Sequence, residues 1–450
     1  MPGSARDNES STPSRTVTAW TQGLLCVAVV AAGVIANGLL YEPEPESRAA
    51  PLSTTTASEP PSPEPYPYVT PPVAYPTRIP GCATVDPPGG GATVTWVGGN
   101  RFGYDNPAYP WFSGPKAVAM STALRDALPD GVALDFAPAD ESLFFQPILG
   151  DPGGSPGPVG GSTTAHATLR RGDRAVGWLS VSVRQSTAPV PPCVAGELDE
   201  RRLLADGTTV DTLDTWSETD GVRTLSRAAT AYVPDGSVVA AYATDAPAGA
   251  DPTGAVPVTV DELVDLVTTP ATRITEPVAP GTPDAPAPCH AQDENSATID
   301  VATAARLDAV LAQIPLDGLT LDRPLGELRP GGFGTGGVCQ AVRVTTAGQQ
   351  SQLSISITAG PESEPAMPAV EVGGATTAQR LPDGTVVENR EAEYVLGEPG
   401  PASSQSNRSV VVTRLSGTRI QVDSTADSAS ALLPHTQLAA IALAPGLEVR

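Results

Sequence analysis

The feature that most constrains the fold is an internal duplication, in which residues near 115–275 match residues near 300–450. Four segments recur in the same order at offsets of roughly 174 to 187 residues, and the clearest pair is WLSVSV at 178–183 against QLSISI at 352–357. About 370 residues remain once the N-terminal segments are set aside, which is the length of two domains of typical size. The sequence therefore predicts two tandem, related domains.

Each repeat is expected to begin with a helix and continue into hairpins. Apolar residues recur at helical spacing over 307–314 and approximately over 117–128, and a proline follows each run. Alternating strands and a closing helix follow, the latter with a capping box at Thr259 and Glu262 in the first repeat. Hairpin turns are predicted at Asp206-Gly207, Asp235-Gly236, Asp383-Gly384 and Ser416-Gly417.

These elements predict an α+β fold class, with an antiparallel meander sheet of about six strands in each domain, covered by the N- and C-terminal helices. The alternative is an all-β sandwich with decorating helices. The predicted organisation, in chain order, is a cytoplasmic tail at 1–16, a transmembrane helix at 17–41, a Pro-rich stalk at 42–80, the first domain at 81–276, a linker at 277–287 and the second domain at 288–450.

Residues 17–41 contain no charged side chain and predict a helix that crosses the cell membrane once. At 1.5 Å per residue it would reach roughly 37 Å, more than a hydrocarbon core of about 30 Å. Arg6 and Arg15 precede it and acidic residues follow it, so the N-terminus is expected in the cytoplasm and the domains outside. The alternative is a signal peptide that is cleaved, which would make the protein secreted.

Four cysteines follow this segment, and a fifth, Cys26, lies within it. An even number in an oxidising compartment predicts two disulfides, with free thiols as the alternative. Cys82 and Cys289 precede the first helix of their repeats. Cys193 and Cys339 lie at the open end of the first hairpin. This layout favours the pairs Cys82 with Cys193 and Cys289 with Cys339.

Charge and motifs exclude several function classes. The net charge of -24, from 50 acidic and 26 basic residues, would repel nucleic acids and acidic lipid surfaces. The three histidines, His166, His290 and His435, lack the spacing of a zinc site, and no nucleotide-binding or EF-hand motif is present. The sequence therefore predicts no metal and no cofactor.

One catalytic pattern is present, Ser113 with Lys116, which matches the Ser-x-x-Lys of penicillin-recognising enzymes. Those enzymes also need a Lys-Thr-Gly triplet, and Lys116 is the only lysine. Ser113 is better interpreted as a helix N-cap with Pro115 in the first turn. The RGD tripeptide at 171–173, known from adhesion ligands, is explained by a hairpin turn. No catalytic residue is predicted.

Six of the 20 aromatic residues fall between positions 96 and 112, among glycines and prolines that predict a loop. Rigid rings on such a loop suit stacking on a sugar or a proline-rich peptide, and the second repeat has no equivalent. Alternatively the rings fold inward as a lid, with Phe136, Phe144 and Phe145 from the next loop. The predicted ligand-binding residues are Trp96, Phe102, Tyr104, Tyr109, Trp111 and Phe112.

A short polar tail, one membrane span, a Pro/Thr-rich stalk and Ala/Gly-rich α+β units with turns such as RLPDGT at 380–385 resemble uncharacterised membrane-anchored envelope proteins of actinobacteria. The resemblance covers the whole chain and implies a role at the cell surface. Anchor, stalk and duplication, without a catalytic motif, favour a non-catalytic binding or scaffold protein whose partner is an envelope polysaccharide or protein. The alternatives are an envelope-directed hydrolase and an extracytoplasmic subunit of a membrane complex.

Overall fold

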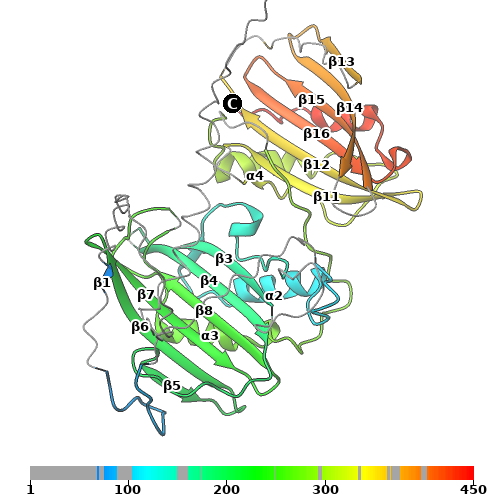
Figure 1. Cartoon of the computed structure of the whole chain (residues 1–450). Coiled ribbons are helices and arrows are strands. Elements are labelled where there is room, and N and C mark those ends of the chain that lie inside the picture. The colour runs from blue at the N-terminus through cyan, green and yellow to red at the C-terminus, as the bar shows by residue number, and fades with distance from the viewer. Residues whose placement is uncertain are drawn as a thin grey trace, which may run out of the picture.

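The computed structural model describes residues 68–69, 75–88, 104–148, 161–173, 175–247, 249–291, 296–332, 336–361, 365, 375–396 and 403–449. They form an α+β structure of two antiparallel sheets and few helices (Figure 1). Among these residues, no helix combines the length and the apolar character needed to cross a membrane. The membrane helix predicted at 17–41 lies outside them, as does the predicted tail at 1–16.

The first sheet has eight strands, and its domain also contains helices that precede β3 and follow β8 in the sequence. Its strands are β1 (Tyr68–Val69), β2 (Val132–Leu134), β3 (Ser162–Arg171), β4 (Ala175–Gln185), β5 (Glu200–Leu203), β6 (Thr209–Thr219), β7 (Val222–Tyr232) and β8 (Ser237–Thr244). The helices are α2 (Gly114–Asp126), η2 (Ala139–Glu141), α3 (Val260–Thr268) and η3 (Pro270–Thr272). The short strands β1 and β2 raise the number above the predicted six.

The strand order of the first sheet is β1-β6-β7-β8-β4-β3-β2, and β5 also pairs with β6. A simple meander would place β5 beside β4. Instead, the chain crosses from β4 to the far edge, and β8 returns to pair with β4. The predicted meander is therefore wrong at this point, because β8 is buried along nearly its whole length and takes a central position. Residues 68–69, in the predicted stalk, pair with the edge of β6.

The second sheet also has eight strands, in the order β10-β11-β12-β16-β15-β14-β13, with β9 paired to β11. These are β9 (Thr320–Leu321), β10 (Arg329–Pro330), β11 (Val338–Thr346), β12 (Gln349–Ala359), β13 (Ala375–Arg380), β14 (Val386–Leu396), β15 (Ser403–Thr413) and β16 (Thr418–Ala426), with α4 (Val301–Leu311), η4 (Ala429–Ala431) and α5 (His435–Ala442). The order from β11 to β14 repeats the order from β3 to β6. A common origin by duplication stays a prediction.

All four predicted hairpin turns are confirmed. They join β5 to β6, β7 to β8, β13 to β14 and β15 to β16, each as an antiparallel pair. The glycine at each turn has a positive φ, between 78° and 89°, which other residues rarely adopt. The turn residues therefore dictate these hairpins locally.

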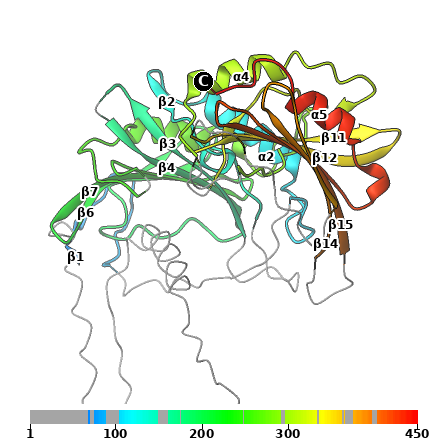
Figure 2. The ribbon, with the colours of Figure 1, turned by 90° about the horizontal axis from the view of Figure 1, so that it is seen from above.

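The helices cover one face of each sheet, as Figures 1 and 2 show for α3 and α5. In β4 the side chains of Leu179, Val181 and Val183 point to this inner face and are fully buried. The predicted helix starts are also confirmed. The Ser113 hydroxyl accepts a hydrogen bond from the Lys116 N–H at 3.2 Å, and Thr259 with Glu262 forms the capping box.

The structure contains two disulfides, with the pairing that the layout predicts. Cys82 is bonded to Cys193 and Cys289 to Cys339, with Cα–Cα distances of 6.2 and 6.0 Å. Each bond ties the segment before a domain's first helix to a later part of that domain. Cys193 lies in the connection between β4 and β5, and Cys339 lies in β11. Two disulfides indicate an oxidising, extracytoplasmic location.

The predicted linker contacts both domains. Asp284 forms an ion pair with Arg343 of β11, and the Arg323 guanidinium donates a hydrogen bond to the Asp284 carbonyl at 2.5 Å. A Cβ atom at Gly114, the first residue of α2, would lie 1.9 Å from the Asp284 carboxylate, so a larger residue there would displace this side chain. In addition, Phe136 of the first domain packs against the apolar core of the second.

Candidate ligand-binding surface

The aromatic loop lies against the core of the first domain. Tyr109 and Phe112 are only 7% and 3% exposed, and Tyr104 and Trp111 are partly buried against the same cluster, which also contains Phe144 and Phe145. Trp96 and Phe102 lie outside the described residues. Two of the six predicted rings therefore belong to the core.

The inward rings contact one another and the next loop. The Phe112 ring centroid lies 5.3 Å from that of Trp111 and 5.9 Å from that of Tyr104. The Tyr104 hydroxyl donates a hydrogen bond to the Phe145 carbonyl at 3.1 Å, and burial raises the pKa of this hydroxyl. These contacts favour the lid alternative. Ligand binding by the exposed parts of Tyr104 and Trp111 stays a prediction.

The Ser113 and Lys116 side chains both have structural contacts. The Lys116 ammonium, 3% exposed, donates hydrogen bonds to the carbonyls of Arg273 at 2.7 Å and Glu276 at 2.5 Å, beyond η3. Burial lowers the pKa of this amine. Because the amine bonds carbonyls that follow α3, it holds α2 to the end of the domain and is not directed at the Ser113 hydroxyl.

Another residue that the sequence analysis considered, Arg171, also has a structural contact. Arg171, the first residue of the RGD tripeptide, forms an ion pair with Glu262 at 2.6 Å, so its guanidinium fixes the β3–β4 turn to the start of α3. Over the described stretches of the chain, no group of three or more His, Cys, Asp or Glu side chains is placed to hold a metal ion.

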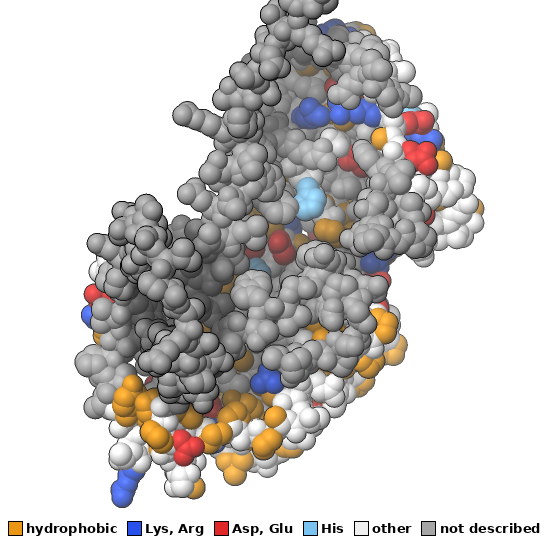
Figure 3. Space-filling model, in the orientation of Figure 1, with side chains coloured by type: hydrophobic (Ala, Val, Ile, Leu, Met, Phe, Trp, Pro, Cys, Tyr) orange, Lys and Arg blue, Asp and Glu red, His pale blue; other side chains and the backbone are white. Residues whose placement is uncertain are grey.

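The outer face of the first sheet, opposite the helices, carries a hollow of about 160 Å³. By strand register, Asp211 and Leu213 of β6 and Thr230 and Tyr232 of β7 lie on this face, and all four line the hollow. A second, wider hollow of about 430 Å³ shares Tyr232 and lies against the turns at the same end of the domain. Figure 3 shows hydrophobic side chains gathered at this lower end of the first domain.

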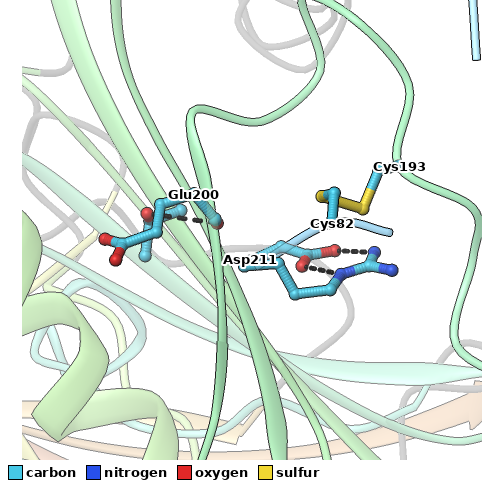
Figure 4. The surroundings of a disulfide bond; sticks show 6 residues. Cys82, Cys193, Glu200 and Asp211 are labelled. Carbon is cyan, nitrogen blue, oxygen red and sulfur yellow. Dashed lines mark hydrogen bonds and ion pairs between the residues drawn. A yellow bond between two sulfur atoms is a disulfide. The ribbon is translucent and has the colours of Figure 1, made fainter. Parts of the chain in front are cut away.

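One wall of the smaller hollow comes from the segment between β4 and β5. Pro191, Pro192 and Leu198 line it, and Leu198 packs with Cys193 and Ile79 in a separate small apolar cluster. The disulfide to Cys82 holds this segment, as Figure 4 shows. Prolines restrict the backbone as well, so the wall is rigid before any ligand arrives.

Charged groups at the hollow are arranged around an ion pair. The Arg201 guanidinium donates two hydrogen bonds to the Asp211 carboxylate, at 2.6 and 2.7 Å, beside the disulfide (Figure 4). Burial, and then the charge of Asp211, raise the pKa of the Tyr232 hydroxyl, which stays protonated at neutral pH. Tyr232 can therefore donate a hydrogen bond to a ligand in the hollow.

A second aromatic group lies on the same outer face, toward β3. The rings of His166 and Trp178 are stacked, with centroids 4.7 Å apart and an angle of 28° between the ring planes. Burial lowers the pKa of His166, so the imidazole is neutral at neutral pH. Sequence reasoning missed this pair. The sequence pattern that could have indicated it is the WLSVSV strand, where Trp178 occupies a position that alternation assigns to the polar face.

The outer face of the second sheet is polar. The carboxylate of Asp423 in β16 accepts hydrogen bonds from the Gln421 side-chain amide at 3.1 and 3.0 Å. Burial raises the pKa of Asp423 to about 6, against the smaller opposing effects of Gln421 and Arg390. Asp423 is therefore ionised at neutral pH at a cost in stability.

We expect Asp423 to make the second domain less stable as the pH rises. Its folded-state pKa of about 6 lies above the ordinary value of 3.8, so the folded state holds the proton more tightly than the unfolded state. The stabilisation is complete below about pH 4 and is lost as the pH rises through about 6, a total of about 3 kcal/mol. Urea unfolding from about pH 4 to 7 should show this loss in the native chain and not in Asp423→Asn. An equal loss in both would contradict it.

No family model, curated protein or solved structure matches this chain. Candidate sites in the protein are therefore defined by the geometry of its own residues alone.

Proposed function

We propose that this chain is a non-catalytic binding or scaffold protein of the bacterial envelope, anchored by its N-terminal helix, with two domains that arose by duplication. The observation that supports the proposal best is the outer face of the first sheet, where a rigid, disulfide-held wall borders a hollow lined by Tyr232, Leu198 and two prolines. Pre-formed hollows that combine apolar side chains with polar groups are typical of binding sites.

The use of the reactive side chains also supports a non-catalytic function. Lys116 bonds two carbonyls, and Ser113 caps a helix. Among the described residues, the carboxyl groups with a raised pKa are Glu141 in η2, Asp308 in α4 and Asp423 in β16, on three separate elements. A glycoside hydrolase would need one such acid opposite an ionised carboxylate on the same substrate. None of the three lines either hollow, so this rival is less well supported.

We expect the full chain to retain an envelope polysaccharide or protein, and the retention to depend on Tyr232. This ring lines both hollows, and aromatic side chains dominate binding energies. Tyr232→Ala should therefore weaken retention about tenfold or more. The measurement is retention of fractionated envelope material on the immobilised full chain.

The matched control for this experiment is Tyr75→Ala, whose ring is 52% exposed and lies outside both hollows. It should retain as much as the native chain. Fragments released from envelope material in proportion to time would instead identify a hydrolase. A membrane protein retained in fixed stoichiometry by both variants would identify a subunit of a larger complex.

A further inference from the structure

We propose that the outer face of the first sheet binds an uncharged oligosaccharide, which lies across the strands from the His166–Trp178 pair to the hollow beside Tyr232. This inference rests on the proposed binding function and names the chemical class of its ligand. Four observations support it: the ring pair, the hydroxyl groups around it that bond to no described residue, the small residues beside it, and the balance of charge.

The ring pair places an imidazole and an indole, both partly exposed, on the outer face. His166 on β3 is stacked on Trp178 on the neighbouring strand β4, and its own ring nitrogens form no hydrogen bond with the described residues. Sugars present C–H groups on the faces of their rings, which pack on aromatic planes, and hydroxyls at their edges. One side-chain pair can therefore stack on a sugar and hydrogen-bond to it.

Hydroxyl groups surround this pair. Thr164 and Thr168 of β3 and Ser180 and Ser182 of β4 alternate with the buried core residues and therefore lie on the outer face. All four are half-buried, yet their hydroxyls bond to no described residue. Half-buried hydroxyls without a partner among the described residues suit a ligand whose own hydroxyls donate and accept.

Small side chains continue the surface from the ring pair toward the hollow. In register, Ser182 of β4 lies opposite Ala240 of β8, which lies opposite Thr230 of β7. Two strand spacings, about 10 Å, separate β4 from β7. Thr230 lines the hollow of about 160 Å³, and a cavity of about 150 Å³ accommodates a group the size of one six-membered ring. An extended chain of sugars matches this path.

The charges favour a neutral ligand. Arg170 is paired with Asp135 near the ring pair, and Arg201 with Asp211 at the hollow. The two further charged groups that act on Tyr232 there, Arg184 and Glu197, have opposite signs, so the local charges balance. The net charge of -24 repels a polyanion.

Calorimetric titration of the full chain with two neutral probes, chitohexaose and maltohexaose, tests the inference. At least one should bind, and Trp178→Ala should weaken it tenfold or more. The matched control is Trp216→Ala on the opposite face, where the Arg223 guanidinium lies 3.9 Å from the centre of the ring. The affinity of this variant for the probe should stay within about twofold of the native value. Ala240→Phe, which fills the path and keeps both rings, should also weaken binding.

Unchanged affinity in both Trp178→Ala and Ala240→Phe would overturn the inference, as would the absence of binding to either probe. Unfolding midpoints of all variants establish that they fold.

If a synthetic peptide of residues 57–67, which is rich in proline, binds through Trp178 while the sugars do not, the ligand is a protein segment. Loss of the oligosaccharide inference alone leaves the Tyr232-dependent retention of envelope material intact. Failure of the proposed function abolishes that retention as well.

Discussion

Replacement of Cys82 and Cys193 by serine should lower the free energy of unfolding of the first domain by about 5 kcal/mol. The bond joins residues 111 positions apart, so its loss restores a large conformational freedom to the unfolded chain. This amount is a large fraction of the stability of an ordinary domain. Urea unfolding of the native and variant chains, without a reductant, measures the difference.

The second disulfide provides the comparison. Cys289 and Cys339 are 50 positions apart, so the same reasoning gives about 4 kcal/mol for their replacement by serine. The first pair should therefore have the larger effect. Its removal should also loosen the wall of the hollow, because the wall residue Leu198 packs against Cys193. Equal stability of native and variant chains would show that these bonds do not constrain the unfolded state.

Phe112→Ala should lower the free energy of unfolding of the first domain by about 3 to 5 kcal/mol. The ring is 3% exposed and contacts the rings of Tyr104 and Trp111, so its removal leaves a cavity in the core. Trp111→Ala should cost less, because the Trp111 ring is only partly buried. Thermal and urea unfolding of the two variants give the ranking.

The control for the ring substitutions is Tyr75→Ala, at 52% exposure, which should change stability by less than about 0.5 kcal/mol. A loss for Phe112→Ala as small as that for Tyr75→Ala would mean that the loop is not part of the core. The aromatic loop would then regain its place as the first candidate for a ligand-binding surface.

Hairpins were predictable from this sequence, and the strand order was not. Each Gly of the Asp-Gly and Ser-Gly pairs adopts a positive φ, a property of the turn itself, so Gly207 and Gly384 mark their hairpins without reference to the rest of the chain. The pairing of β4 with β8 depends on which strand is covered well enough to take the central position beside β4. That property emerges only when the helices and the other strands are in place.

Composition likewise did not decide whether the rings of the aromatic loop point toward the core or toward solvent. Glycines and prolines predict a loop, and a loop can turn its rings outward or inward. A contact far along the chain decides it, since a Cβ at Gly161 would lie 2.4 Å from the Tyr109 ring. The His166–Trp178 pair was missed for the same reason, because strand register across β3 and β4 brings the two rings together.

By itself, the sequence determined the repeated pattern of helices and hairpins, the helix caps at Ser113 and Thr259, and the two disulfides, because these follow from local backbone preferences and from the position of each cysteine in its repeat. Only the tertiary structure decided the strand order, the burial of Phe112, the bonding of Lys116 to two distant carbonyls and the hollow behind Pro191. Those features are sums of contacts between residues far apart in the chain, and such contacts leave no periodic or local pattern in a single sequence.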